Sequence, residues 1–386
     1  MTPARHPTTI VLAITQTLAW GTSYYLPAIL AVPIADSLDL QTHWIFAAFS
    51  SALIVAAAVA PTVGRWIDRY GGRDVLAGSN LVLAAGLALL GSADSAVLIA
   101  LSWLVLGFGM AMGLYEAAFT TLAGIHGPQA RRAMTAITLL GGLASTIFWP
   151  ATTYLDAAIG WRMTCFAWAF VHLAVGLPLN LLGVVPATQS NLSSPIECSS
   201  NRPRRRRTMI LLAIVFTAAW SVSTAIAAHL PRLLSESGLS SAAAVSVAAL
   251  VGPAQLGGRL LEFSAVRHVH PLLSARLAAM AHPVGGLALL LFGGPAAALF
   301  ALLHGAGNGI LTVAKGTLPL VLFGSSGYGQ RQGMLTIPAR MGQAVAPFGF
   351  AILIEQWGIA ALALSISTSL ISVAALVAVT PMPRDS

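Results

Sequence analysis

The chain has 386 residues, of which 57% are hydrophobic and only 8% are charged, and its mean hydropathy is +0.81. Soluble globular proteins carry about 25% charged residues, so this composition excludes an ordinary soluble domain and indicates a membrane protein. The formal net charge of +8 comes mainly from arginines in short polar connections, a pattern typical of membrane topology rather than of a nucleic-acid-binding surface.

Apolar stretches of about 20 residues, the length of a membrane-crossing helix, follow one another from end to end. These stretches are continuously apolar and do not alternate, which excludes the strands of a membrane barrel. The sequence therefore predicts an all-α membrane protein with twelve transmembrane helices. The predicted segments are 8–33, 44–64, 75–92, 95–123, 133–155, 163–185, 208–231, 240–258, 272–293, 296–323, 334–354 and 358–379.

The longest polar connection divides these segments into two sets of six. It is rich in Ser, Asn, Pro and Arg, which is typical of a flexible linker. We expect an N-terminal six-helix bundle over 1–186, a cytoplasmic linker over 187–207 and a C-terminal six-helix bundle over 208–386. The halves repeat weakly, since PTVGRWID (61–68) matches PAQLGGRLLE (253–262) with an acid four residues after the glycine that precedes arginine.

The charges of the connections predict the orientation of the helices. Most arginines fall in connections on the same side of the membrane as the N-terminus, and the opposite connections carry mostly acids. By the positive-inside rule, both termini are expected in the cytoplasm. The first apolar run is too long for a signal-peptide core and is expected to remain as a helix. Cys165 and Cys198 lack the spacing of a disulfide framework or a metal site, and we expect no metal and no cofactor.

The connection GRWIDRYGGRDVL, residues 64–76, resembles the signature loop of the major facilitator superfamily. The matching residues are Gly64, Asp68 four positions later, Arg69, Gly71 and Arg73. Gly72 stands where the family usually has a basic residue. With twelve segments and a degenerate second copy of the loop, the resemblance covers the whole chain. It implies two six-helix bundles and solute transport by alternating access, rather than enzymatic activity.

The same loop has a physical interpretation that is independent of the family. Gly64 and Gly71 permit a close helix approach and a sharp turn, while Asp68 beside Arg69 and Arg73 can pair with charges or helix ends. We expect these five residues to form a gating latch that breaks when the halves move. A simple positive-inside anchor is the alternative, which explains the arginines but not the acid at this spacing.

The subgroup is indicated by the fifth segment. RRAMTAITLLGGLAS (131–145), followed by Pro150 and by GWR (160–162), is similar to monocarboxylate-transporter-like members. The Gly-Pro pair of drug antiporters is absent from this fifth segment. In the fourth segment, Trp103 stands where many family members have an arginine. Both departures weigh against multidrug export, and proton-coupled efflux of drugs or metabolites stays as the alternative function.

Ionisable side chains inside a membrane are costly and are therefore functional candidates. Lys315, the only lysine of the chain, lies within about 40° of His304 and Asn308 on one face of its helix. In the same way, Gly109, Met112 and Glu116 share a face of the fourth segment, and Gln16, Trp20 and Tyr24 form a stripe on the first. The resemblance implies that the segments carrying these polar and aromatic stripes line or flank a central cavity. The predicted substrate-binding residues are Trp20, Tyr24, Tyr25, Trp149, His304, Asn308, Lys315, Arg340 and Gln343.

Lys315 and Arg340 are two cations and Glu116 is one acid, so the predicted site has a surplus of positive charge. This surplus favours an anionic substrate, such as a carboxylate. In this account Lys315 or Arg340 binds the anion, and Glu116 takes and releases a proton. In the competing account, Glu116 pairs with one of the cations as a structural or gating bridge. Further alternatives are that Lys315 extends to water at a helix end, that His304 and Asn308 only join helices, and that the aromatic residues only pack.

Two other classes of function are alternatives to transport. GSSG at 324–327 matches a nucleophile pattern with Ser326, which would indicate an intramembrane serine hydrolase, but the motif stands among turn-forming residues. A receptor or assembly factor that transports nothing is the third class. No nucleotide-binding loop occurs in the sequence. We expect a monomer in the bacterial cytoplasmic (inner) membrane that moves a small organic solute by secondary active transport, coupled to protons and without nucleic acid.

Overall fold

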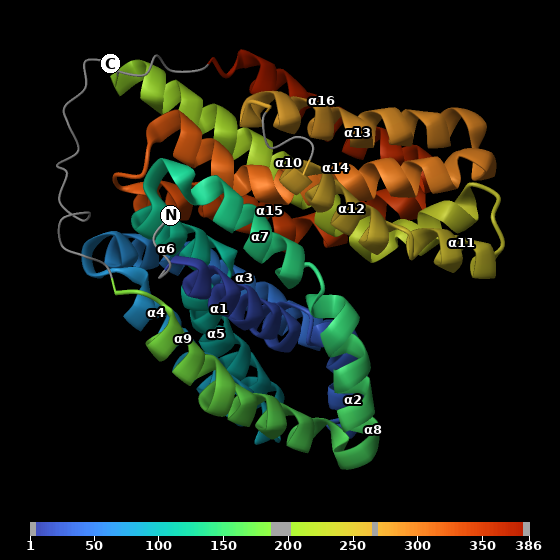
Figure 1. Ribbon diagram of the computed structural model, residues 1–386. Coiled ribbons are helices and arrows are strands. Elements are labelled where there is room, and N and C mark those ends of the chain that lie inside the picture. Colours follow the sequence, from blue (N-terminus) through green and yellow to red (C-terminus); the bar gives the residue numbers. More distant parts are fainter. Residues whose placement is uncertain (1–4, 187–201, 265–268, 381–386) are drawn as a thin grey trace. The chain divides into compact units, whose positions relative to one another are not determined.

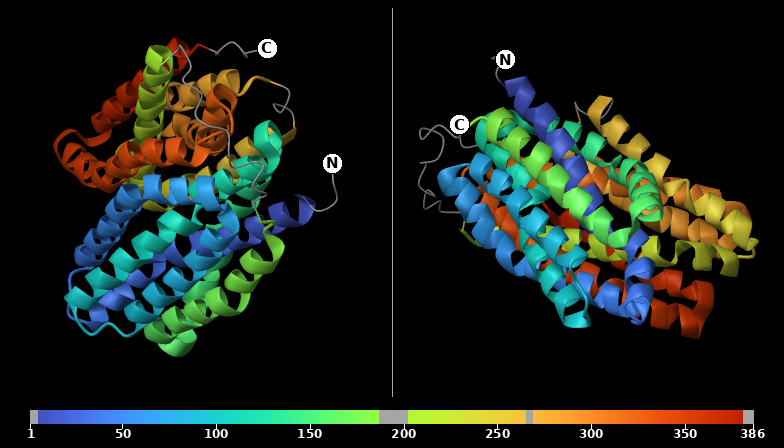
Figure 2. Two further views of the ribbon diagram at one scale, coloured as in Figure 1. Left: turned by 90° about the vertical axis from the view of Figure 1, so that its left-hand side faces the viewer. Right: turned by 90° about the horizontal axis from the view of Figure 1, so that it is seen from below.

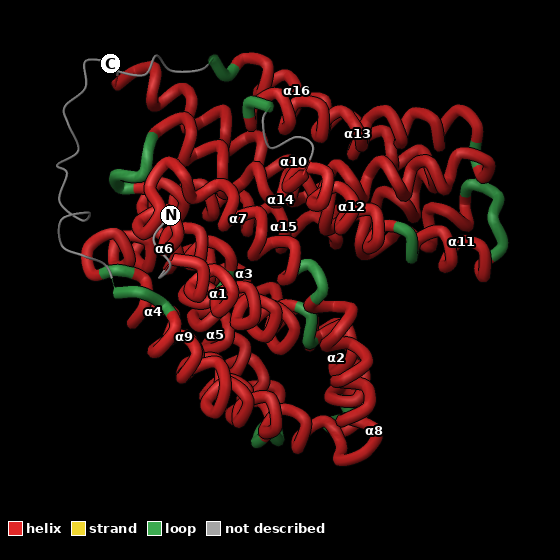
Figure 3. Tube along the Cα trace, in the orientation of Figure 1, coloured by secondary structure: helices red, strands yellow, loops and turns green. Residues whose placement is uncertain are grey.

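The computed structural model describes residues 5–186, 202–264 and 269–380. Within these ranges every regular element is a helix and no strand occurs (Figure 3). This confirms the predicted all-α class. Continuous apolar runs adopt helices because a helix satisfies all of its backbone hydrogen bonds within one segment, as a lipid environment demands.

The first half of the chain forms helices in the order of the predicted segments (Figure 1). These are α1 (Arg5–Ala19), the π-helical turn η1 (Trp20–Tyr24), α2 (Pro27–Ser37), α3 (Thr42–Tyr70), α4 (Gly72–Gly91), α5 (Ala96–Gly113), α6 (Tyr115–His126), η2 (Gly127–Gln129), α7 (Ala130–Gly141), α8 (Ala144–Val171), the π-helical turn η3 (His172–Gly176) and α9 (Leu177–Gly183).

The second half continues in the same way. Its elements are α10 (Arg202–Glu236), α11 (Ser241–Ala248), α12 (Val251–Ser264), α13 (Pro271–Phe292), η6 (Gly294–Ala296), α14 (Ala297–Phe323), α15 (Tyr328–Trp357), η7 (Gly358–Ala361) and α16 (Leu362–Ala378).

Nine helical stretches in the described part of the chain are long and apolar enough to cross a membrane. Two of them hold more than one crossing. Ala96–Gly183 divides into three at Gly127 and Gly160, and Tyr328–Ala378 divides into two at Gly358. These three glycines have positive φ, a conformation that reverses the chain without strain only in glycine. The stretches therefore resolve into the twelve segments that the sequence predicts.

Two helices differ from their predicted course. α10 begins at Arg202 instead of residue 208, so the run RPRRRR, at the end of the predicted linker, is helical. Arginine is a good helix former and proline is tolerated in a first turn. The remainder of the predicted linker, 187–201 with Cys198, lies outside the described residues. The fourth segment is not one helix, because α5 ends at Gly113 and the extended Leu114 precedes α6.

The contacts within the chain divide it into two compact units (Figure 2). The first unit comprises Met1–Glu197 and Gly324–Ile337, and the second comprises Cys198–Phe323 and Pro338–Ser386. The division between the units therefore falls inside α15. By its contacts the beginning of this helix groups with the first unit, although its sequence lies in the second half.

Small residues bring helices of the first unit close together. A Cβ atom at Gly107 of α5 would lie 2.4 Å from the carbonyl oxygen of Ala52 on α3. A side chain of any size at this position would separate the two helices. Close packing through glycine is common where helices associate inside a membrane.

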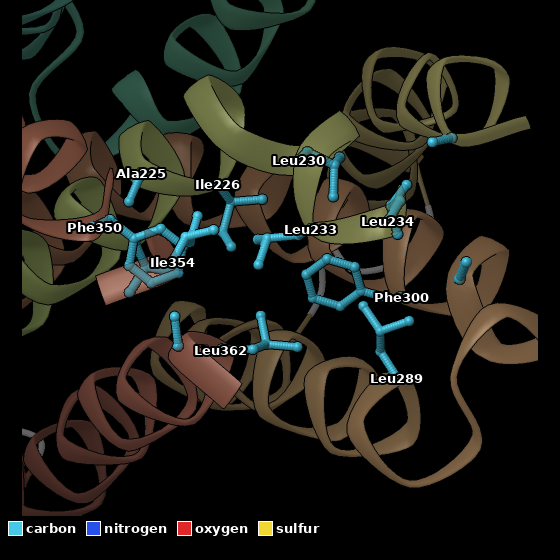
Figure 4. Packing of buried hydrophobic residues seen from close by; sticks show 14 residues of the cluster. Ala225, Ile226, Leu230, Leu233, Leu234, Leu289, Phe300, Phe350, Ile354 and Leu362 are labelled. Atoms are coloured by element: carbon cyan, nitrogen blue, oxygen red, sulfur yellow. The ribbon is translucent and has the colours of Figure 1, made fainter. Parts of the chain in front are cut away.

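The core of the second unit is a continuous apolar cluster (Figure 4). Phe300 of α14 belongs to it and is fully buried, together with Leu233 of α10, Leu289 of α13 and Leu362 of α16. Packing of this kind holds α10, α13, α14 and α16 as one body. The polar residues of α14 that follow Phe300 are positioned by this core.

Candidate functional site

Asp68 of the predicted latch binds the beginning of α15. Its Oδ1 accepts a hydrogen bond from the backbone N–H of Gly329 at 2.9 Å, and its Oδ2 accepts one from Gln330 at 2.9 Å. The first N–H groups of a helix have no partner within the helix, and the helix dipole favours a negative charge there. The half-buried carboxylate therefore caps α15 and attaches it to α3.

Glycine makes this attachment possible. A Cβ at Gly64 would lie 2.0 Å from the carbonyl oxygen of Gly329, and one at Gly333 would lie 2.5 Å from the Cα of Pro61. Gly329 and Gly333 are four residues apart and face α3 with the same side of α15. This pair was missed in the sequence, although its small-residue spacing is the signal that indicates close helix packing.

The other loop residues have different surroundings. Gly71 separates α3 from α4 with a φ of 86°, which is the sharp turn that the sequence predicts. The Arg73 Nε lies 2.8 Å from the Asp74 Oδ1 on the surface, where such a pair contributes little. Arg69 is exposed and its guanidinium carbon lies 5.3 Å from the centre of the Tyr70 ring. Of the predicted latch residues, Gly64 and Asp68 are therefore the ones that contact α15.

Replacing Gly64 with alanine is expected to destabilise the purified protein. The new methyl group would overlap a backbone oxygen that cannot move aside, and overpacking of this kind costs about 1–3 kcal/mol. The measurement is the thermal unfolding midpoint in detergent. Gly124→Ala on α6 is the matched control, because a Cβ there has no neighbour within 4 Å. Equal midpoints for the two variants would contradict the close contact between α3 and α15.

Glu116 lies in the first turn of α6, directly after the break at Leu114. It lines a small cavity of the first unit together with Gly64, Thr120, Gly329 and Gln332. The carboxyl group is therefore grouped with the beginning of α15 and with the helix that carries Asp68. The interruption of the helix also ends the regular face that the sequence assigned to Glu116, Gly109 and Met112.

The four predicted aromatic residues of the first unit lie in one cluster. The Trp20 ring is 5.0 Å from Tyr24 and 5.9 Å from Tyr25 between centres, and Tyr25 is 6.0 Å from Trp149. The Trp149 Nε1 donates a hydrogen bond to the Tyr25 carbonyl at 3.3 Å. Tyr115 joins the cluster at 4.8 Å from Trp20 and was not expected from the sequence.

A π-helical turn arranges this cluster. In η1 the Tyr25 N–H bonds to the Trp20 carbonyl at 3.0 Å, five residues back. The wider turn places Trp20, Tyr24 and Tyr25 side by side, so that their rings form a half-buried surface. Single π-helical turns occur frequently at functional sites.

In the second unit, Lys315 is 4% exposed and its Nζ lies 4.7 Å from the centre of the Trp220 ring. An ammonium group above an indole face is attracted by the ring quadrupole. In this structure the ammonium therefore lies beside α10, rather than extended along the helix toward an exposed end.

Arg340 of α15 is 2% exposed. Its Nη1 donates to the Gln343 Oε1 at 3.2 Å, and the Gln343 Nε2 donates to the Thr224 Oγ1 at 3.4 Å. Thr224 lies four residues after Trp220, and residues at this spacing share a helix face. Two buried cations from different helices are thus brought to consecutive turns of α10.

His304 and Asn308 line a separate cavity of the second unit, of about 30 Å³, together with His282, Ser369 and Ser372. Along α14, His304 and Lys315 are eleven residues apart, which is about 16 Å at 1.5 Å per residue. The predicted C-terminal residues therefore form two groups: Lys315, Arg340 and Gln343 near α10, and His304 with Asn308 at the cavity. His282 was missed in the sequence, although a histidine within an apolar segment is itself a functional signal.

The alternative of a serine nucleophile has no support in the described part of the chain. Ser326 is exposed in the turn between α14 and α15, where Gly324 and Gly327 have positive φ. Turn formation thus accounts for the GSSG motif. No group of three or more residues that could hold a metal ion occurs among the described residues.

Comparisons with known proteins agree on one family. The model of the Major Facilitator Superfamily matches residues 12–314. No curated protein matches the chain. Among solved structures, the transporter FucP in the outward conformation has a TM-score of 0.76 at 14% identity, covering 95% of this chain and 97% of that chain.

Two further solved structures have the same fold. A variant of the E. coli fucose:proton symporter FucP has a TM-score of 0.75 at 14% identity, with 97% and 98% of the two chains covered. The human organic anion transporter MFSD10 has a TM-score of 0.71 at 16% identity, with 97% and 100% covered.

Proposed function

The chain belongs to the major facilitator superfamily, and we propose that it moves a small organic anion, such as a carboxylate, across the membrane by alternating access. It is an integral membrane protein of a transporter family. The anion and its coupling to protons are the parts of the proposal that go beyond the family.

The two buried cations at consecutive turns of α10 carry the proposal for an anion. Burying positive charge in a membrane protein is costly, and an anionic ligand offsets that cost for both groups. Arginine can hold a carboxylate through two parallel hydrogen bonds, and lysine adds a compact charge. Gln343, which bonds to Arg340, orients the guanidinium in this proposal.

Two of the solved structures with this fold have described functions. One is described as an organic anion transporter and another as a fucose:proton symporter, but at 14–16% identity they inform only the fold. The choice of an anion therefore rests on Lys315 and Arg340. The aromatic cluster around Trp20 is proposed to contact the organic part of the solute, in keeping with the apolar lining of most ligand sites.

Proton coupling and gating are proposed for residues of the first unit. Glu116 is the proposed proton carrier, in a half-buried position beside the first turns of α15. The bonds from Asp68 to α15 are the proposed latch, with Gly64, Arg69, Gly71 and Arg73 as its loop. Breaking and re-forming the attachment would then accompany alternating access.

The proposed setting is the bacterial cytoplasmic membrane, with both termini in the cytoplasm and the protein acting as a monomer. The distribution of arginines among the connections supports this orientation.

Carboxylates are expected to raise the thermal unfolding midpoint of the purified protein. A ligand present at about 100 times its Kd stabilises the folded state by about 2.7 kcal/mol. The measurement is a thermal-shift series with monocarboxylates, dicarboxylates, neutral sugars and cationic drugs at one ionic strength. Stabilisation by cationic drugs alone would contradict the anion proposal and would favour the efflux alternative.

A further inference from the structure

Two histidines of the second unit form a hydrogen-bonded chain that ends at a serine. The Nδ1 atoms of His282 on α13 and His304 on α14 are 2.8 Å apart, and the His282 Nε2 is 3.0 Å from the Ser365 Oγ. Ser365 in turn donates its hydroxyl hydrogen to the Leu362 carbonyl at 2.8 Å. The three side chains are buried.

The direction of these bonds determines which ring nitrogens carry hydrogen. A serine hydroxyl has one hydrogen, and Ser365 donates it to Leu362, so the His282 Nε2 must donate to Ser365. In a neutral His282 the Nδ1 is then an acceptor, and the His304 Nδ1 must donate to it. The His304 Nε2 is left as a bare acceptor. The opposite arrangement, with Ser365 donating to His282, would lose the bond to Leu362.

A proton added to the His304 Nε2 breaks none of these bonds. The His304 ring becomes positively charged and continues to donate from Nδ1, while His282 and Ser365 stay as they are. Phe300 stacks on the His304 ring, with 5.7 Å between centres and 19° between planes, and an aromatic face attracts such a cation. The chain is therefore arranged to hold one proton at a defined atom.

The cavity that His304 lines is the size of a few waters and has several polar groups within a partly apolar lining. Asn308, Ser369 and Ser372 also line it, and the 2% exposed Ser372 hydroxyl has no hydrogen-bond partner among the described residues. A volume of about 30 Å³ accommodates about two ordered waters. It is too small for an organic solute, so its polar groups fit water and protons instead.

No charged or titratable side chain other than the two histidines lines this cavity among the described residues. Among the described elements that pack around α13 and α14, α11, η6 and α16 carry no charged or titratable side chain. The remaining helices carry such side chains, but apart from the two histidines none of them lines the cavity. These others are Arg276 on α13, Lys315 on α14, Arg259 and Glu262 on α12, and Arg204, Arg205, Arg206, Arg207, His229, Arg232 and Glu236 on α10. Among the residues that the structure describes, the two histidines are thus the only titratable groups that line the cavity.

We propose that the His282–His304 pair is a proton-binding site of the second unit, with the His304 Nε2 as the atom that takes the proton from cavity water. Ser365 is a positioning residue, since its hydroxyl sets the direction of the chain. A role of this site in coupling rests on the proposed transport function, whereas proton binding itself does not. The site is additional to the carboxyl group of Glu116.

The test is solid-state NMR of 15N-histidine-labelled protein in lipid vesicles, titrated from about pH 8 to about pH 4, on both sides of the ordinary histidine pKa. The His304 Nε2 is expected to be bare at the upper end and to gain a hydrogen on acidification, while its Nδ1 stays protonated. His304→Asn keeps an N–H for His282 and should remove this one titration. His229→Asn, whose histidine bonds to the Pro347 carbonyl elsewhere in the unit, should leave it unchanged.

Ser365→Ala gives a second signature. Without the hydroxyl, the His282 Nε2 loses its acceptor, and the chain is expected to reverse so that the neutral His304 carries its hydrogen on Nε2. The proposal is overturned if the His304 Nε2 is already protonated at the upper pH in the unsubstituted protein, or if it gains no hydrogen over the range. A titration that persists in His304→Asn would also overturn it. None of these results depends on a transported solute.

Discussion

Lys315→Ala is expected to abolish transport of the carboxylate that stabilises the protein, with normal amounts of folded protein in the membrane. The substitution removes a buried positive charge above Trp220. Hydrogen bonds to charged groups contribute about 1.5–3 kcal/mol, so the affinity for an anion should fall roughly 10- to 100-fold. The measurement is uptake into proteoliposomes, together with the thermal shift that the same carboxylate produces.

Two further variants separate charge from packing. Lys315→Met keeps an unbranched apolar chain and removes the charge, so it should behave like Lys315→Ala. Lys315→Arg keeps the charge and should retain part of the binding. Arg340→Ala should also lower the affinity for the anion, because it removes the second buried cation near α10. Normal transport by both alanine variants would contradict the anion site.

Asp68→Ala is expected to release the beginning of α15 from α3. The variant loses two hydrogen bonds from backbone N–H groups to a carboxylate. Since one hydrogen bond to a charged group contributes about 1.5–3 kcal/mol, the equilibrium between the attached and the released state should shift at least roughly 10-fold toward release. Asp68→Asn keeps one acceptor oxygen and should have a smaller effect of the same sign.

Thiol labelling measures this release. Thr120→Cys, in a protein whose own Cys165 and Cys198 are replaced by serine, reports on the contact because Thr120 is buried beside Gly329. Its labelling rate should rise roughly 10-fold or more in Asp68→Ala. Asp74→Asn is the control, since Asp74 pairs only on the surface with Arg73. Equal rates in all three proteins would reduce the loop to a topological anchor.

Much of the fold could be predicted from local sequence. Apolar length gave the positions of the twelve segments, because a run of about 20 apolar residues has few other stable arrangements. Glycine at position 71 correctly indicated the turn between α3 and α4. The acid at position 68 was expected to meet a charge or a helix end, and it caps α15.

The partners of these residues could not be predicted, because they depend on tertiary packing. Nothing in the local pattern of YGQRQG indicates that its first glycine contacts Gly64, 265 positions earlier. Helical periodicity assigned Glu116 to a continuous face, but it does not report a break such as that at Leu114. Periodicity also placed His304 and Lys315 on one side of α14 without showing that they contact different groups.

The histidine chain illustrates a further limit. His282 and Ser365 are separated by 83 positions and carry no motif, so only the three-dimensional arrangement joins them to His304. A buried polar side chain signals that a partner exists, but it does not identify that partner.

Counterflow in proteoliposomes tests the central claim most directly. Vesicles are loaded with the stabilising carboxylate and diluted into a trace of the labelled compound, with no pH gradient imposed. Transient accumulation of label is predicted for the unsubstituted protein and for Glu116→Gln, which should lose only gradient-driven uptake, and none for Lys315→Ala. If folded, reconstituted protein exchanges no carboxylate in this assay, or if Lys315→Ala exchanges it at the normal rate, the account is contradicted.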